Sequence, residues 1–195
     1  MFLALQAPQE VREVLVKIQQ EVRERMPDSI ARWTRPEQFH LTLKFLGDVE
    51  VDRAEELESA IRQVTSNVGR FDVTATGIGF FPDAHRPRVL WAGVSNRGAQ
   101  LANLFHLAQK ACEAFTSVPG EKEFVGHITL GRIKKLGRKD RHAPGTIVTV
   151  HKDAPLGNWT IESVEIMRSE LSAAGAVHET VASIPLGHRT AQRFE

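Results

Sequence analysis

QFHLTLKFLGDVE, residues 38–50, decides the fold: polar and apolar side chains alternate along it up to a glycine. Alternate side chains of a β-strand face the same way, so the pattern predicts a half-buried strand over 38–46. His40, Thr42 and Lys44 are expected on one face of that strand, with the leucines between them on the other. Taken alone, His40 is most simply a structural strand residue, because a single short motif predicts function poorly.

A second stretch, FVGHITLGRIKK at residues 124–135, repeats the order of histidine, aliphatic residue, threonine and leucine. It predicts another strand over 124–133, and His127 lies 87 positions after His40 (127 minus 40). The same offset aligns Thr42 with Thr129, Leu43 with Leu130, Val14 with Leu101, and Ile18 with Phe105. This shared offset indicates an internal duplication, with two lobes related by a pseudo-two-fold axis. Core packing explains the repeated aliphatic residues but not the repeated His and Thr, so the pair of motifs points to function.

Both copies follow the order strand, helix, His-Thr strand. Apolar residues at helical spacing predict helices over 9–26 and 52–66 and a third that carries Leu101 and Phe105. We therefore expect an α+β fold of two pseudo-symmetric lobes, each an antiparallel β-sheet with helices packed outside, enclosing a central cleft. The expected organisation is a single bilobal domain over 1–195.

The duplication is expected to diverge after the second motif. There the counterparts of the second helix, residues 139–155, contain Pro144, Gly145 and the β-branched run TIVTV. We expect no matching helix at this point. The strands expected in this part of the chain are 146–151, 159–171 and 177–186.

The composition is that of an ordinary globular chain of 195 residues, with 42% hydrophobic and 25% charged residues and a net charge of +1. Such a small charge excludes sequence-blind attraction to polyanions, so any contact with nucleic acid must be local. The single cysteine, Cys112, rules out an intramolecular disulfide and cysteine-based zinc modules. The start of the chain, MFLALQAPQEV, shows neither a signal peptide nor a membrane span, and the expected location is the cytoplasm.

Two histidines and two threonines on opposite walls of one cleft suit an in-line displacement at phosphorus. The nucleophile enters opposite the leaving group, so a base is needed on one side and an acid on the other. An imidazole has an ordinary pKa of about 6.5 and can take either role, which makes His40 and His127 the candidate catalytic residues. The hydroxyls of Thr42 and Thr129 can donate to the non-bridging oxygens, whose negative charge grows in the transition state. The residues alone leave open which histidine donates the proton.

Three further residues are candidates for contacts with the substrate. Arg132 and Lys44 could add fixed positive charge to the site. Strict alternation places Arg132 on the face away from His127, so its participation requires a bulge or a strand end. Trp33, which lies between arginines and just before the first motif, is the candidate for stacking on a nucleobase. Lys44 and Trp33 are therefore the expected RNA contacts outside the phosphate site.

Several segments together resemble the two-histidine (2H) phosphoesterase superfamily, and within it the bacterial and archaeal RNA 2′,3′-cyclic phosphodiesterases, originally called 2′-5′ RNA ligases. They are FHLTLKFLG, GHITLGRI, the opening FLALQAPQEV, ARWTRPEQFHLTLKFLGDV, RVLWAGV and the late MRSELSAAGAVHETVASIPL. The resemblance covers nearly the whole chain. It implies hydrolysis of an RNA 2′,3′-cyclic phosphate to a 2′-phosphomonoester with no metal and no cofactor, and in some members the joining of RNA ends through a 2′-5′ linkage.

The resemblance also implies a role for each matching residue. His40 resembles the proton donor to the leaving 3′ oxygen, and His127 resembles the proton acceptor that activates water. Thr42, Thr129 and Arg132 match phosphate-contacting positions. The implied partner is RNA with a 2′,3′-cyclic phosphate end, tRNA fragments included, and neither a membrane nor an obligate protein partner is expected.

The sequence departs from the family pattern at two places. His178 stands where many relatives have a tyrosine in the penultimate strand, and RKDRHAPGTIVTVHKDAP replaces the helix expected after the second motif. Both departures concern contacts with the end of the substrate and leave the two His-Thr pairs intact.

Two other enzyme classes fit the sequence less well. A metal hydrolase needs three or more well-placed protein ligands, whereas the sequence has two good histidines and no H-E-x-x-H or C-x-x-C motif. An ATP-dependent ligase needs a phosphate-binding loop, and TGIGFF lacks its lysine and spacing. A non-catalytic module that binds RNA ends stays open, although phosphate binding alone would tolerate Lys or Arg in place of both histidines. A phosphodiesterase for another small cyclic or 2′-5′ nucleotide also stays open.

Overall fold

The computed structural model describes residues 1–26, 30–120, 123–134, 136–137, 142–172 and 175–188. The strands in these residues are β1 (Phe2–Gln6), β2 (Ala31–Trp33), β3 (His40–Phe45), β4 (Phe71–Phe81), β5 (Val89–Ser95), β6 (His127–Ile133), β7 (Pro155–Ile161), β8 (Ser163–Ser172) and β9 (Gly175–Pro185). The α-helices are α1 (Gln9–Arg25), α2 (Ala54–Thr65), α3 (Gln100–Ala111) and α4 (Ala143–His151), and the short 3-10 helices are η2 (Pro36–Gln38), η3 (Val51–Arg53) and η4 (Glu113–Phe115). None of the helices in this part of the chain is long and apolar enough to cross a membrane.

The strands form one sheet in the order β7-β4-β5-β6-β3-β1-β8-β9, with β2 also paired to β6. The four central strands are arranged symmetrically. In the repeat β6 corresponds to β3 and β5 to β1, and the two members of each pair lie on opposite sides of the centre. All pairings between these strands are antiparallel. The α+β fold with two pseudo-symmetric halves is therefore confirmed, and the halves share a single continuous sheet.

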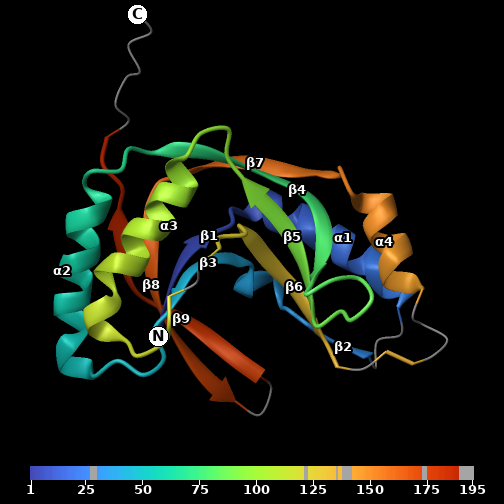
Figure 1. Ribbon diagram of the computed structural model, residues 1–195, viewed down its shortest axis with the longest axis horizontal. Coiled ribbons are helices and arrows are strands. Elements are labelled where there is room, and N and C mark those ends of the chain that lie inside the picture. Colours follow the sequence, from blue (N-terminus) through green and yellow to red (C-terminus); the bar gives the residue numbers. More distant parts are fainter. Residues whose placement is uncertain (27–29, 121–122, 135, 138–141, 173–174, 189–195) are drawn as a thin grey trace, which may run out of the picture.

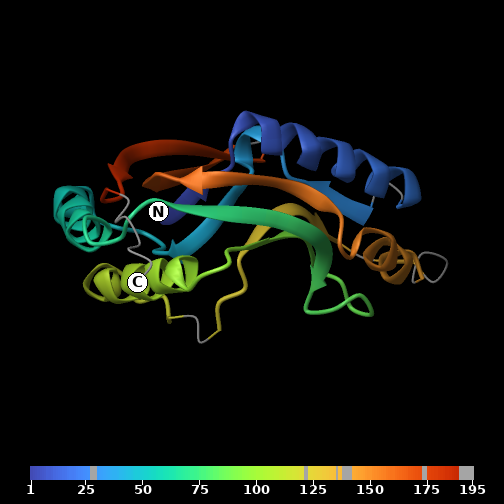
Figure 2. The same cartoon turned by 90° about the horizontal axis from the view of Figure 1, so that it is seen from above.

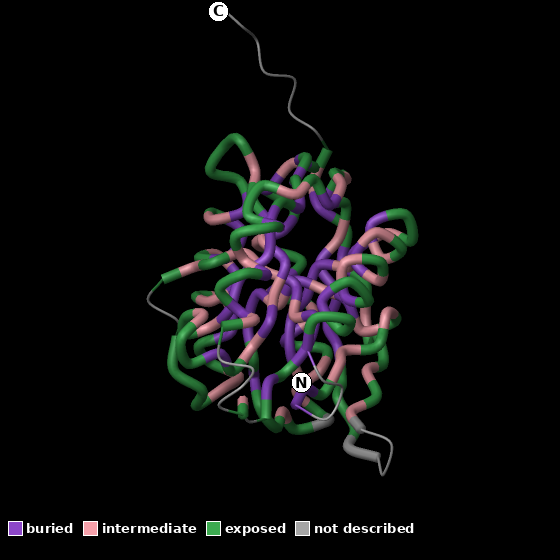
Figure 3. Tube along the Cα trace, turned by 90° about the vertical axis from the view of Figure 1, so that its right-hand side faces the viewer, coloured by how far each residue is buried: buried purple, intermediate pink, exposed green. Residues whose placement is uncertain are grey.

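The main hydrophobic core lies between the helices and one face of this sheet. Leucines and isoleucines that alternate along the central strands are buried there, together with the apolar stripes of all four helices. A smaller cluster of Phe2, Ala4 and Met167 lies on the opposite face of the sheet. Figure 3 shows the buried segments, in purple, concentrated in the middle of the molecule. The alternation of the two histidine strands thus follows directly from one face being buried under helices.

The two halves exchange helices. Helix α1 lies between β1 and β3 in the sequence but packs on β7 and α4, in the half that contains β6. Helix α3 lies between β5 and β6 in the sequence but packs on β3 and α2. Figure 1 shows α2 beside α3 at one end of the molecule and α1 with α4 at the other, and Figure 2 shows the same separation from above. Each half therefore relies on a helix from the other copy of the repeat.

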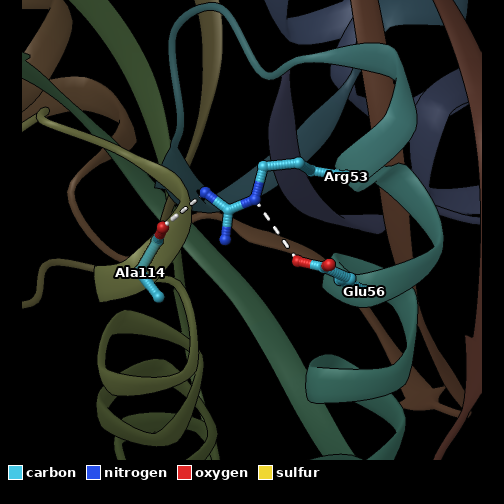
Figure 4. A network of polar contacts seen from close by, with 3 residues as sticks. All are labelled: Arg53, Glu56 and Ala114. Carbon is cyan, nitrogen blue, oxygen red and sulfur yellow. Dashed lines mark hydrogen bonds and ion pairs between the residues drawn. The ribbon is translucent and has the colours of Figure 1, made fainter.

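Arg53, the residue just before α2, joins the start of that helix to η4, which follows α3. Arg53 donates from Nη1 to the carbonyl of Ala114 at 2.8 Å, and its Nε pairs with Glu56 at 3.3 Å (Figure 4). The same guanidinium lies 4.6 Å from the ring centroid of Phe115. These contacts join two helices that belong to different copies of the repeat.

The expectation of no helix within 139–155 is wrong, because α4 occupies most of the described part of that range. Pro144 lies in the first turn, where a missing N–H costs no intrahelical hydrogen bond. Ile147 and His151, one turn apart, are buried where α4 packs on β4 and α1. Burial of one large aliphatic side chain contributes about 2 kcal/mol, which exceeds the few tenths that a β-branched residue costs in a helix. The offset of 87 carries α2 onto this helix, so the duplication extends further than the sequence suggested.

The strand expected over 159–171 is two strands. β7 ends at Ile161 and pairs with β4, whereas β8 begins at Ser163 and pairs with β1 and β9. The chain therefore passes from one half of the sheet to the other at this point. The strand expected over 177–186 corresponds to β9.

Candidate active site

The two histidine strands meet at the centre of the sheet through one pairing in the described residues, Leu41 of β3 with Ile128 of β6. Both of these side chains lie in the main core. The neighbouring side chains must therefore point to the opposite face, which we call the site face. The residues that flank the pairing on the site face are His40, Thr42, His127 and Thr129. In the antiparallel register each histidine lies opposite the threonine of the other strand.

The strand β3 has a β-bulge at Leu43. Two successive residues of β1 pair with Thr42 and Lys44, which leaves Leu43 as an extra residue. One extra residue reverses the side-chain alternation beyond it. Lys44 therefore lies on the core face, 4% exposed, where its Nζ donates to two carbonyls of the segment after α3 at 2.9 Å each. The expectation that Lys44 shares the face of His40 and contacts RNA is wrong for this reason.

The strand β6 has the equivalent bulge, at Leu130. Two successive residues of β5 pair with Thr129 and Gly131, so Leu130 is the extra residue. Beyond the bulge the alternation reverses, and Arg132 points to the site face and is exposed. The residues of β5 opposite Thr129 and Arg132 are two positions apart, which places both on the same face. The bulge that the participation of Arg132 requires is therefore present.

The pseudo-symmetry of the site is broken at the first exposed residue after each bulge. In β6 this residue is Arg132, and in β3 it is Phe45, which is 48% exposed and lies 6.0 Å from the ring of Phe2. The two strands otherwise show the same order of half-buried, buried and exposed residues. One end of the site face thus carries a guanidinium where the other carries a phenyl ring.

Trp33 does not lie on the site face. It pairs with Gly131 across β2 and β6, and a Cβ on that glycine would lie 3.1 Å from the indole ring. The guanidinium of Arg23 on α1 lies over the same indole, 5.6 Å from the ring centroid. Trp33 therefore lies on the face away from the two histidines, and its stacking on a nucleobase stays a prediction. Its neighbour Arg32 lies opposite Arg132 instead, and two like charges across a strand pair have no structural benefit.

The ring of His40 is enclosed by aromatic neighbours. It stacks on Phe2 at 5.0 Å and meets the ring of His178 edge-on at 5.5 Å. Burial lowers the pKa of His40 to about 4, and the charge of His178 and, to a smaller extent, that of His127 act in the same direction. The carbonyl of Gln38 opposes them, although Nδ1 makes no hydrogen bond of ordinary geometry within the described part of the chain. In the ligand-free protein His40 is therefore uncharged at neutral pH.

His127 is oriented by its own strand. Its Nδ1 lies 2.7 Å from the carbonyl of Val125, and because a carbonyl can only accept, Nδ1 is the donor. This hydrogen bond leaves Nε2 with a free lone pair in the neutral imidazole. The ring of Phe81 meets the imidazole edge-on at 4.9 Å. His127 is thus held in the tautomer that can accept a proton at Nε2.

A pocket of about 440 Å³ is lined by Val125 and Gly126, the residues just before His127. Trp91 and Gly93 of β5 line it, and their strand partners are Thr129 and His127, so the pocket reaches the site face. The indole ring of Trp91 lies over Gly79, where a Cβ would come within 2.4 Å of it. Another pocket, of about 450 Å³, lies between α1 and η2 and contains none of the site residues.

Sequence reasoning missed Arg32 and Trp91 as residues of the site face. Both stand opposite residues of the second motif, and this relation is a property of strand pairing rather than of spacing along the chain. The available signal for Trp91 was the offset of 87, which identifies RVLWAGV as the partner strand of the second motif.

Other reactive groups are not placed at this site. Burial raises the pKa of the Cys112 thiol to about 12, and its side chain lies in the main core, so it is not a nucleophile. Within the described ranges, no group of three or more His, Cys, Asp or Glu side chains is placed to hold a metal ion.

Comparison with known proteins places this geometry in a family. The family model described as LigT like Phosphoesterase matches residues 5–91. The RNA 2′,3′-cyclic phosphodiesterase of Thermotoga maritima is 31% identical over 180 residues, 92% of this chain and 91% of that protein. The protein of the same name from Aquifex aeolicus is 28% identical over 187 residues, 95% of this chain and 96% of that one.

Solved structures show the same fold. A protein of Thermus thermophilus matches with a TM-score of 0.77 and 26% identity, over 97% of this chain and 98% of that one. E. coli LigT complexed with 3′-AMP matches with a TM-score of 0.74 over 95% of this chain and 96% of that one, and at 20% identity it shows the fold alone. Because the Thermotoga relative shares nearly a third of its residues along nine-tenths of both chains, this protein belongs to the LigT-like phosphoesterase family of the two-histidine superfamily.

Proposed function

We propose that this protein is an RNA 2′,3′-cyclic phosphodiesterase that forms 2′-phosphomonoester ends without a metal ion. The observation that carries the proposal is the arrangement of two His-Thr pairs around one strand pairing, with Arg132 on the same face. The names of the bacterial and archaeal relatives support it. The continuous sheet and the exchange of helices between halves support one bilobal domain over 1–195, and we place its activity in the cytoplasm.

In the proposed reaction a water molecule attacks phosphorus opposite the 3′ oxygen. His127 takes the proton of this water at Nε2, the atom that its hydrogen bond to Val125 leaves free. The bond between phosphorus and the 3′ oxygen breaks, and His40 donates its proton to that oxygen. The phosphate remains on the 2′ oxygen, and both histidines exchange their protons with solvent before the next turnover.

His40 must be charged to donate a proton, whereas in the ligand-free protein its pKa is about 4. A phosphodiester is an anion, and a negative charge within a few ångströms favours the imidazolium form. Substrate binding is therefore proposed to raise the pKa of His40, so that its imidazole becomes protonated. Binding and protonation are coupled in this account, so the donor carries its proton only when there is a leaving group to receive it.

The remaining residues of the site face have proposed binding roles. Thr42, Thr129 and Arg132 donate to the non-bridging oxygens of the phosphate. Arg32, opposite Arg132, would contact the next phosphate of an RNA strand, and the pocket beside Trp91 would hold the adjoining nucleoside. With the 5′-hydroxyl of another RNA in place of water, the same step would form a 2′-5′ linkage, and its reversal would break one.

The experiment that tests this function is incubation of the purified protein with an oligoribonucleotide ending in a 2′,3′-cyclic phosphate, in excess chelator, with and without ATP. We expect a 2′-phosphate product at the same rate in both samples. Binding without turnover would support the RNA-end binding module instead. A kcat/KM far higher for a free cyclic mononucleotide than for the oligomer would mean that the substrate is a small cyclic nucleotide and not an RNA end. A 3′-phosphate product would reverse the roles of the two ribose oxygens.

A further inference from the structure

A glutamine from α1 bonds to the bulge of the second motif. Gln19 is 5% exposed, and its Nε2 donates to the carbonyl of Leu130 and to the carbonyl of Thr34, both at 2.8 Å. Leu130 is the extra residue of the bulge in β6, and Thr34 follows directly after β2. The backbone N–H of Thr34 also donates to Leu130 at 3.0 Å. Gln19 thus fastens the bulge to the chain segment beside it.

The bulge of the first motif has the same contact from a different residue. Gln109 on α3 donates from Nε2 to the carbonyl of Leu43 at 2.8 Å, and Leu43 is the extra residue of β3. The offset of 87 aligns Leu43 with Leu130 but does not align Gln19 with Gln109, which are 90 positions apart (109 minus 19). Each bulge therefore receives a side-chain amide from the helix that the other copy of the repeat supplies. The duplicated structure has kept the contact while its position on the helix has changed.

A bulge needs such a contact because its extra residue leaves the regular ladder. A buried carbonyl without enough hydrogen-bond donors destabilises the fold. A strand that returned to regular pairing would supply those donors from its neighbour. Regular pairing would shift the register by one residue and turn every following side chain to the other face. In β6 the side chain that would leave the site face is Arg132.

We propose that Gln19 is a positioning residue that maintains the bulge at Leu130 and so keeps Arg132 directed at the substrate phosphate. Gln109 maintains the equivalent bulge in β3, where the residue carried to the site face is Phe45. The bulge in β3 also keeps Lys44 on the core face. The two glutamines therefore have the same structural task, but only the bulge that Gln19 maintains directs a phosphate contact to the site face. This inference rests on the proposed role of Arg132 as a phosphate contact.

The pseudo-symmetry supplies a matched control within one chain. Gln19→Met and Gln109→Met each remove a donor while keeping the length of the side chain. Both are expected to lower the melting temperature, Gln19→Met by more because its amide donates to two carbonyls. Gln19→Met is expected to weaken binding of inorganic phosphate, and to lower kcat/KM, by about tenfold, the scale of one charge-assisted hydrogen bond. Gln109→Met removes no phosphate contact, so neither quantity is expected to fall by more than about twofold.

The measurement is a titration of each folded variant with inorganic phosphate, repeated in an Arg132→Ala background. There Gln19→Met should have no further effect on phosphate affinity, because the residue that it positions is gone. Equal losses of affinity in the two glutamine variants, or a full additional loss in the Arg132→Ala background, would overturn the inference while leaving the proposed function intact. An unchanged affinity in Arg132→Ala alone would overturn the role of Arg132 itself, and the inference with it.

A second variant keeps the test available if Gln19→Met does not fold. Gln19→Ala leaves space for a water molecule, which can donate to the carbonyl of Leu130 in place of the amide. We expect a smaller loss of phosphate affinity in the same direction, again absent in the Arg132→Ala background. The proposal would be contradicted if a folded Gln19→Ala protein, without an ordered water at the carbonyl of Leu130, kept its full phosphate affinity.

Discussion

Replacing His40 or His127 by alanine is expected to lower turnover of an RNA 2′,3′-cyclic phosphate by about a hundredfold or more, the usual scale for the loss of a general acid or base. Each variant removes one of the two proton transfers while the phosphate contacts of the threonines and Arg132 remain. Substrate affinity should therefore change much less than kcat. Steady-state kinetics with a cyclic-phosphate oligoribonucleotide measure both quantities.

His106→Ala is the matched control for these variants. His106 lies on the exposed side of α3, and its ring contacts Phe105 away from the site face. The control should retain full activity. The double variant of His40 and His127 should be little worse than either single variant, because the two residues act in one concerted step. A folded single variant with near-normal turnover would mean that the two-histidine mechanism is wrong.

Arg132→Ala is expected to lower kcat/KM by about a hundredfold, as found when one donor to a developing oxyanion is removed. The kcat/KM of Arg132→Lys should lie between those of the original protein and Arg132→Ala, because an ammonium supplies charge without the paired donors of a guanidinium. The difference in kcat/KM between the original protein and Arg132→Ala should be smaller at high salt, because salt screens the attraction between Arg132 and the phosphate. These rates are measured with the same oligoribonucleotide at two ionic strengths.

Arg168→Ala is the control for the loss of one positive charge. Arg168 is exposed on β8, where it pairs with Glu179 at 2.7 Å and Glu170 at 3.3 Å. Its removal should leave kcat/KM within about twofold. If Arg132→Ala were equally mild, the guanidinium would not contact the phosphate.

The two bulges explain why one site residue was found from the sequence and another was misplaced. Strict alternation assigns Arg132 to the core face, and a charged residue at a core position is itself a signal that the alternation must break. In the first motif the same rule assigns Lys44 to the open face. A lysine is ordinary on an open face, so nothing in the sequence indicates the bulge there. The structure shows an identical bulge in both strands. A charged residue in the second copy therefore carried the information needed to place the residues of the first.

Helix α4 and Trp33 show a different limit of sequence reasoning. The run TIVTV favours a strand by local preference, but α4 forms because Ile147 is buried against the rest of the fold. Trp33 lies between arginines in the sequence, yet strand pairing places it over Gly131 on the core face. In both cases tertiary contacts decide the outcome. The offset of 87 was the one long-range relation that the sequence contained, and it aligned the second helix with α4 correctly.

The central claim is that His40 and His127 exchange protons with the two sides of one phosphorus atom. The pH dependence of kcat/KM tests it most directly, because the two limbs report the essential acid and base of the free enzyme. We predict a bell-shaped profile whose maximum lies below the ordinary histidine value of about 6.5, because the donor His40 must be protonated and burial lowers its pKa to about 4. In kcat this maximum should move to higher pH, because the bound phosphodiester favours the imidazolium form of His40. A profile that is flat from about pH 5 to 9, with chemistry shown to be rate-limiting, would contradict the account.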